Sequence, residues 1–168
     1  RFSINISAHS LADDRFLEFV LHEIGQRDID PGCLYFEISE STAVSTLDKA
    51  QKFVSLVQGR GCGAILSDFG TGLSSLAYLR NVRVDFVKID GQLIRGLTED
   101  PTHRALVESI HHVAHVMEIR TIADGVDSPE SLEFLRQIDI DYVQGPHIAE
   151  PEDLADVVRR HDPRRASA

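Results

Sequence analysis

Six short runs of β-forming residues alternate along this chain with longer stretches of helical periodicity. The runs span residues 2–7, 34–39, 63–68, 84–90, 119–124 and 140–144. After the first run, apolar side chains recur at spacings of three and four, at Phe16, Phe19, Val20 and Ile24. Two helix starts are marked by proline, in the pairs Asp100-Pro101 and Ser128-Pro129. Strands that alternate with amphipathic helices predict parallel strands joined by right-handed crossovers.

Each of the six runs ends in polar residues. In chain order these are Asn5 and Ser7, Glu37 and Glu40, Asp68, Lys88 and Asp90, Asp124, and Gln144. Such a series is expected of a (β/α) barrel, in which the carboxyl ends of the strands and the loops after them form one site. The alternative is a set of ordinary solvated strand ends, but carboxylates at four of the six ends favour a site.

The third run ends in a carboxylate and a glycine-rich turn. Asp68 is followed by Gly70 and Gly72, which allow a sharp turn or a close approach to a ligand. Polar residues at a strand end are equally common as turn formers, so this motif alone leaves both interpretations open.

A length of 168 residues and an apolar content of 42% indicate one globular domain. The two cysteines are expected to be small core residues. The net charge of -10 argues against binding to polymeric nucleic acid, but a small phosphate ester bridged by metal ions is compatible with it. The sequence contains neither a signal-peptide pattern nor a membrane-span pattern. A cytoplasmic protein without membrane contact is therefore expected.

A closed (β/α)8 TIM-type barrel needs eight strands, whereas about six βα units fit here. We therefore expect an α/β barrel that is incomplete in this chain, with its first two strands upstream. Residues 1–158 are assigned to the barrel fragment, and 159–168 to a polar tail or linker.

Six motifs in this order resemble the EAL-domain family of cyclic di-GMP phosphodiesterases, and the resemblance extends from residue 1 to about 151. They are SINIS (3–7), FEISES (36–41), SDFGTG (67–72), VKID (87–90), IADGVD (122–127) and QG (144–145). The resemblance implies a barrel that binds this bacterial second messenger and, in active members, linearises it with two divalent ions, Mg²⁺ or Mn²⁺.

The resemblance also implies a role for each strand-end residue. Asn5, Glu37 and Asp68 would be metal ligands, since oxygen donors suit these ions. Lys88 would orient the attacking water or take its proton, and Glu40 would support the loop after the third strand. Four residues would bind or surround the ligand: Ser67, Asp90, Asp124 and Gln144.

Two positions depart from the family pattern. Ser67 stands where active members have the metal-bridging aspartate, and Asp124 stands in place of a glutamate, with a reach shorter by one methylene. A serine hydroxyl is a neutral, poor metal ligand. The chain is thus interpreted as a degenerate member that serves in signalling as a cyclic di-GMP receptor or partner-binding module, with weak or no hydrolysis. The alternative is an active phosphodiesterase that produces pGpG.

The loop 72–76 matches the family loop that couples metal binding to dimer contacts, so a homodimer is an expected partner. An upstream sensory or GGDEF domain is a second expected partner.

Two other kinds of site were weighed. His111 and His115 are spaced to bind zinc from one helix face, but no third ligand is near in sequence, so a surface or packing role is favoured. No Gly-x-Ser-x-Gly motif supports a serine hydrolase.

Overall fold

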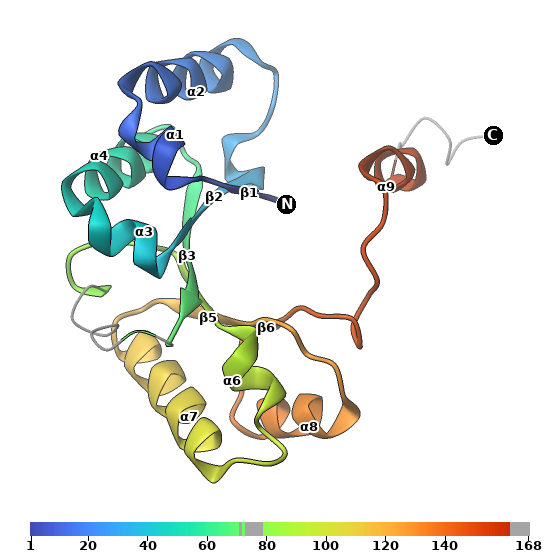
Figure 1. Cartoon of the computed structure of the whole chain (residues 1–168). Helices are drawn as coiled ribbons and strands as arrows, with labels where there is room; N and C mark the ends of the chain where they lie inside the picture. Colours follow the sequence, from blue (N-terminus) through green and yellow to red (C-terminus); the bar gives the residue numbers. More distant parts are fainter. Residues whose placement is uncertain (71, 73–78, 162–168) are drawn as a thin grey trace.

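The computed structural model describes residues 1–70, 72 and 79–161, although not the side chain of the last of these (Figure 1). Six parallel strands form one sheet, in the order in which they occur in the chain. They are β1 (Phe2–Asn5), β2 (Leu34–Ser39), β3 (Gly63–Phe69), β4 (Phe86–Ile89), β5 (Arg120–Ala123) and β6 (Tyr142–Val143). All six predicted strands are confirmed, and the fold is the expected α/β barrel, incomplete in this chain.

Helices connect β1 to β2, β2 to β3, β4 to β5 and β5 to β6, and cover the outer face of the curved sheet (Figure 1). They are α1 (Ala8–Ala12), α2 (Asp14–Gln26), α3 (Glu40–Ser45), α4 (Leu47–Gln58), α6 (Gly91–Arg95), α7 (Pro101–Val116) and α8 (Pro129–Gln137). A short 3-10 helix, Pro31–Cys33, precedes β2, and α9 (Leu154–His161) lies apart from the sheet at the end of an extended segment. The tail boundary proposed at residue 159 falls inside α9 and stays a prediction.

Both helix starts predicted from proline are confirmed. Asp100 caps α7 by accepting a hydrogen bond from the Thr102 N–H at 2.7 Å, and Ser128 caps α8 by accepting one from the Ser131 N–H at 3.3 Å. These bonds satisfy N–H groups that have no partner inside the helix. The caps therefore fix where the helices that flank β5 begin.

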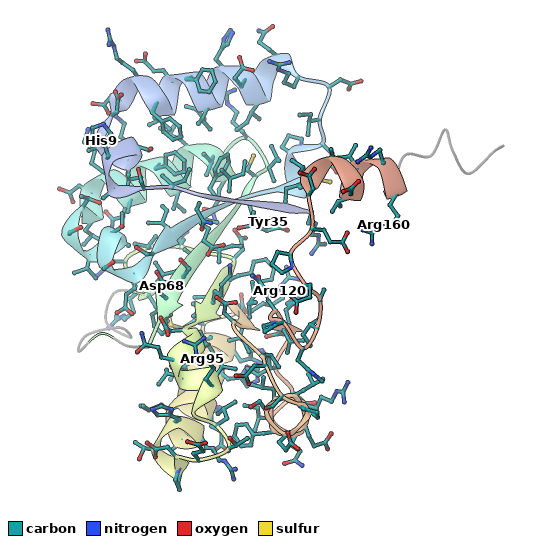
Figure 2. All side chains as sticks on the ribbon, turned by 45° about the vertical axis from the view of Figure 1, so that its right-hand side comes forward. His9, Tyr35, Asp68, Arg95, Arg120 and Arg160 are labelled. Atoms are coloured by element: carbon teal, nitrogen blue, oxygen red, sulfur yellow. The ribbon has the colours of Figure 1, made fainter. Side chains whose placement is uncertain are left out.

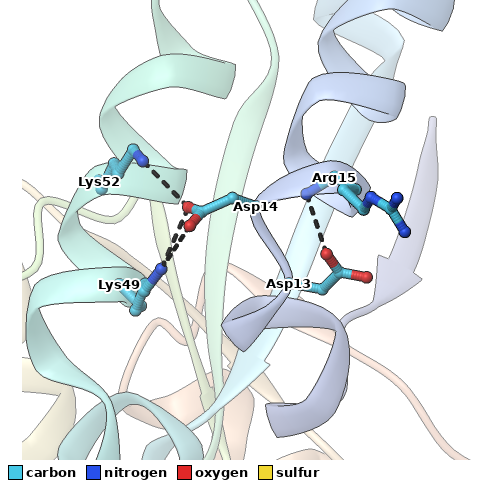
Figure 3. Close-up of polar contacts among 5 residues, drawn as sticks. All are labelled: Asp13, Asp14, Arg15, Lys49 and Lys52. Carbon is cyan, nitrogen blue, oxygen red and sulfur yellow. Dashed lines mark hydrogen bonds and ion pairs between the residues drawn. The ribbon is translucent and has the colours of Figure 1, made fainter.

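Polar contacts also join the two helices beside β1 and β2 (Figure 3). Asp14, at the start of α2, accepts hydrogen bonds from Lys49 and Lys52 of α4 at 3.0 and 3.1 Å. The hydrogen bonds from these two lysines hold the pKa of Asp14 below its ordinary value. Because all three side chains are exposed, the contacts orient the helices more than they stabilise them.

The core lies between the outer face of the sheet and these helices. Phe53 of α4 packs edge-on against Phe36 of β2, with ring centroids 5.5 Å apart, and both rings are buried. Cys62 is buried and Cys33 partly buried, and both are free thiols.

Phe19 of the predicted apolar helix face is instead exposed. It flanks the edge strand β1, where it lines a groove with Ile4. Within the described ranges, no helix has the length and apolar character needed to cross a membrane.

Candidate functional site

The predicted strand-end residues share the inner face of the sheet. A pocket on this face is lined by residues from all six strands, among them Tyr35 of β2, Ile65 of β3, Phe86 of β4, Ile122 of β5 and Tyr142 of β6. Side chains alternate between the two faces of a strand, so the residues two positions further on point the same way. Those residues are Glu37, Ser67, Lys88, Asp124 and Gln144.

Adjacent strand ends are held side by side by main-chain hydrogen bonds. The N–H groups of Asp90, Asp124 and Gln144 donate to carbonyl oxygens of the preceding strand, at 3.0, 3.2 and 2.9 Å. Asn5 is paired in register with Glu37 on the neighbouring strand β2. The structure therefore brings the predicted site residues to one edge of the sheet, as the barrel prediction required.

A buried ion pair connects the second and fourth strands across this face. Lys88 Nζ donates to both carboxylate oxygens of Glu37, at 2.8 and 2.7 Å, and the Ser3 hydroxyl donates to Glu37 Oε2 at 2.7 Å. Side-chain exposure is 10% for Lys88 and 7% for Glu37. Glu37 is thus a carboxylate held in one orientation by three hydrogen bonds, which is what a metal ligand needs.

Asp68 is placed by an irregularity in its strand. The β3–β4 register shifts between Leu66 and Phe69, and Asp68 adopts φ +54°. This left-handed conformation is uncommon for a residue other than glycine and costs about 1–3 kcal/mol, so surrounding structure has to maintain it. A bulge of this kind re-aims a side chain at the end of a strand, and such bulges are frequent next to functional sites.

Carboxylates crowd around Asp68. Burial raises the pKa of its carboxyl above the ordinary value, and three neighbouring carboxylates raise it further, those of Asp90, Glu37 and Asp124. The Lys88 ammonium acts in the opposite direction. These side chains from β2, β3, β4 and β5 are therefore close enough to interact electrostatically, and their negative charge is only partly offset.

Two of these carboxylates also have local structural roles. Asp90 caps helix α6 by accepting from the Gln92 N–H at 2.6 Å, and Asp124 accepts from the Gly125 N–H at 2.8 Å. Each bond uses one carboxylate oxygen, so the second oxygen of each group remains able to contact a ligand. Gln144 is exposed at the end of β6.

Glu40 lies under the turn that follows Asp68. Its Oε2 accepts from the Gly70 N–H at 3.2 Å, and a Cβ atom on Gly72 would be 2.7 Å from Glu40 Oε1. This buried carboxylate thus contacts the start of the loop that the resemblance assigns to it. Most of the predicted dimer loop, residues 73–76, lies outside the described residues.

Two further side chains at the site were not found by sequence reasoning. Ser3 contacts Glu37 because β1 and β2 pair, and only that pairing reveals it. The Arg95 guanidinium lies over Gly91 and Gly125, where added Cβ atoms would be 2.9 and 3.1 Å from its Nη1. Figure 2 labels Asp68 on β3 and Arg95 on α6. In the sequence, the glycines at positions 91 and 125 were the available signal for Arg95, because a residue without a side chain leaves space for a large neighbour.

The residues present fit a hard divalent cation. Glu37, Asp68 and Asn5 offer oxygen donors, and the uncompensated negative charge around Asp68 is the environment that such a cation stabilises. Ser67 is buried beside them and offers only a neutral hydroxyl. This donor set thus has one carboxylate fewer than the resemblance implies for active members, because position 67 is a serine.

Comparison with known proteins identifies the family. The EAL domain model matches residues 1–151. The chain belongs to the EAL domain family. It is 36% identical to the cyclic di-GMP phosphodiesterase PdeF of Escherichia coli over its whole length, and 35% identical to PdeB of Shewanella oneidensis over 98% of it. The matched segments are only 22% and 19% of those proteins, so this EAL domain spans about a fifth of their length.

Solved EAL domains have the same fold. The c-di-GMP complex of the PaMucR phosphodiesterase matches with a TM-score of 0.85 and 28% identity, over 92% of this chain and 63% of that one. The EAL domain of FimX from Pseudomonas aeruginosa bound to c-di-GMP matches with a TM-score of 0.84 and 27% identity, over 89% and 62%. This EAL domain therefore matches the larger part of each of these two solved chains.

Proposed function

We propose that this EAL domain binds cyclic di-GMP at the carboxyl ends of its strands and hydrolyses it weakly or not at all. The observation that carries the proposal is the serine at position 67, buried on the inner face immediately before Asp68. A neutral hydroxyl cannot offset the charge of two adjacent cations. Ligand contacts from other strand ends do not depend on that residue.

Asn5, Glu37 and Asp68 would hold a divalent cation, Mg²⁺ or Mn²⁺. When bound, such an ion stabilises the attacking and leaving oxygens of a phosphoryl displacement. Lys88 holds Glu37 in place through its ion pair, and its ammonium lies where a water at the Glu37 carboxylate would be oriented. Glu40 maintains the turn after Asp68 through its bond to Gly70.

Ligand recognition is assigned to the other strand ends. Asp90 and Asp124 each have a carboxylate oxygen available for a guanine or ribose hydrogen bond. Gln144 is exposed on the same edge, where its amide can pair with a guanine or form the site wall. Arg95 adds a guanidinium suited to a phosphate oxygen.

An active phosphodiesterase that produces pGpG is the second candidate. It is favoured by the relatives PdeF and PdeB, both named as cyclic di-GMP phosphodiesterases, at 36% and 35% identity. In that case the carboxylates of Glu37 and Asp68 would suffice to hold the metal. The two candidates differ in turnover and agree on the ligand.

The test compares two substitutions at position 67 in the full-length protein. Ser67→Asp should raise cyclic di-GMP hydrolysis with Mn²⁺ at least about tenfold, or about 1.4 kcal/mol of transition-state stabilisation, and Ser67→Ala should change it little. Calorimetry should detect cyclic di-GMP binding by the wild type in the presence of chelator. Efficient wild-type turnover that Ser67→Asp does not increase would favour the active enzyme. Absence of binding would leave only a protein-binding role.

The remaining assignments are proposals of the same kind. Residues 1–158 form the barrel part and 159–168 a tail, in a cytoplasmic protein. Its partners would be a second copy of the chain and a sensory or GGDEF domain. The relative MucR of Pseudomonas aeruginosa, 29% identical over 89% of this chain, is named a bifunctional diguanylate cyclase and phosphodiesterase, which supports such an arrangement.

A further inference from the structure

Three side chains with metal-ligand chemistry converge at the opposite end of the strands. His111 and His115 lie one turn apart on α7, and Asp141 immediately precedes β6. One ligand atom from each lies within 4.8 Å of the other two. The two imidazole rings are 4.1 Å apart between centroids. The spacing of four residues between His111 and His115 predicted two ligands from the sequence. The packing of α7 beside β5 and β6 adds Asp141 as the third.

This cluster is separate from the site at the carboxyl ends. It surrounds Thr121, the second residue of β5, whereas Asp124 follows the end of the same strand. Three residues of extended chain span about 10 Å. Figure 2 shows Arg120, the neighbour of Thr121, away from Asp68. A cation bound here would therefore be distinct from one bound by Glu37 and Asp68.

Thr121 organises the cluster through hydrogen bonds to two of its members. Its hydroxyl and its N–H donate to Asp141 Oδ2 at 2.9 and 2.8 Å, and its oxygen lies 2.8 Å from His111 Nδ1. Since the hydroxyl hydrogen goes to Asp141, the oxygen accepts from a protonated Nδ1 of His111. The neutral imidazole then has its lone pair on Nε2, where it can bind a cation. Partners of this kind orient the ligands of metal sites.

The cluster is also accessible. The His115 side chain is 45% exposed and Asp141 21%, whereas His111 is buried. His115 Nε2 lies 2.9 Å from Asp141 Oδ2. Ligands of a tetrahedral ion at about 2.0–2.2 Å lie a little over 3 Å apart. The three ligand atoms lie within 4.8 Å of one another, so side-chain rotation, for which the exposed His115 has room, would have to adjust their distances around an ion. The open side leaves a position for a water ligand.

We propose that His111, His115 and Asp141 form a binding site for a transition-metal dication of the zinc class, which ties α7 to the start of β6. Two imidazoles and one carboxylate suit zinc, whereas Mg²⁺ prefers oxygen ligands alone. The ion would replace the His115–Asp141 hydrogen bond and connect the same two elements. The site lies at the amino ends of the strands, which in (β/α) barrels serve stability more than catalysis.

The test uses Zn²⁺ and the full chain, with millimolar Mg²⁺ present to occupy the carboxylates at the other end. Equilibrium dialysis should find one Zn²⁺ per chain, and Co²⁺ should give the visible spectrum of a tetrahedral site. His115→Ala and Asp141→Asn should each weaken binding at least tenfold, and Thr121→Val about tenfold through lost orientation. Asp68→Asn should leave this Zn²⁺ bound.

His112→Ala is the matched control, because His112 is an exposed histidine on the same helix and outside the cluster. It should bind Zn²⁺ as the wild type does, and circular dichroism should show that all variants are folded. Equal Zn²⁺ affinity in His112→Ala and His115→Ala would overturn the proposal. Binding lost only with Asp68→Asn would assign the Zn²⁺ to the other site. No binding at all would leave the cluster as a hydrogen-bonded network only.

Discussion

Replacing Lys88 with methionine is expected to destabilise the domain by about 3 kcal/mol in metal-free buffer. The change leaves the Glu37 carboxylate buried without its counter-charge, and breaking such a pair costs about 3–5 kcal/mol. Lys88 donates to both carboxylate oxygens, so both lose a bond. The Ser3 hydroxyl still donates at 2.7 Å, which places the expected loss at the lower end of the range.

Urea unfolding at neutral pH with chelator measures the loss. The double variant Lys88→Met with Glu37→Leu should recover most of it, because replacing both partners with apolar groups removes the unpaired charge. Mg²⁺ should also stabilise the single variant, by about 2.7 kcal/mol at a hundred times its Kd, because a cation at Glu37 takes the place of the ammonium. Lys49→Met removes an exposed lysine from the Asp14 pair and should change stability little.

Two results would refute this reasoning. A Lys88→Met variant as stable as Lys49→Met would mean that solvent reaches Glu37 and that the pair is not effectively buried. A double variant no more stable than the single one would mean that the lost stability came from packing of the lysine methylenes, not from an unpaired charge.

Two further predictions concern Asp68 and the turn after it. Burial and neighbouring carboxylates raise the pKa of Asp68, so its ionisation costs stability as pH rises through the folded pKa. Asp68→Asn should therefore be more stable than wild type at pH 7. Urea unfolding across pH should show this difference vanish below the ordinary pKa value of 3.8. Gly70→Ala should destabilise by about 1–3 kcal/mol, since Gly70 has φ +104° and a Cβ there would be 2.7 Å from Ile110 Cδ1. Gly25→Ala, inside α2 with its nearest contact at 3.4 Å, should instead stabilise by up to about 1 kcal/mol in thermal unfolding; equal effects at both glycines would contradict the argument.

Much of this fold follows from local sequence patterns. The six strands, the parallel order and the helix starts at Asp100 and Ser128 depend on hydrophobic periodicity and capping, which act over a few residues. The common edge of the strand-end residues follows too, because parallel strands end on the same side of a sheet. The resemblance to the EAL family rested on motifs at those ends, and the family match confirms it.

The tertiary structure decided which side chains meet. The Lys88–Glu37 pair joins strands that are not adjacent, so its distance depends on how the sheet curves. The conformation of Asp68 arises from a register shift between β3 and β4, which no local pattern encodes. Asp141 reaches the histidines of α7 only because β6 pairs with β5 under that helix. Sequence periodicity fixes the face on which a residue lies, but distances across that face are set by packing between elements far apart in the chain.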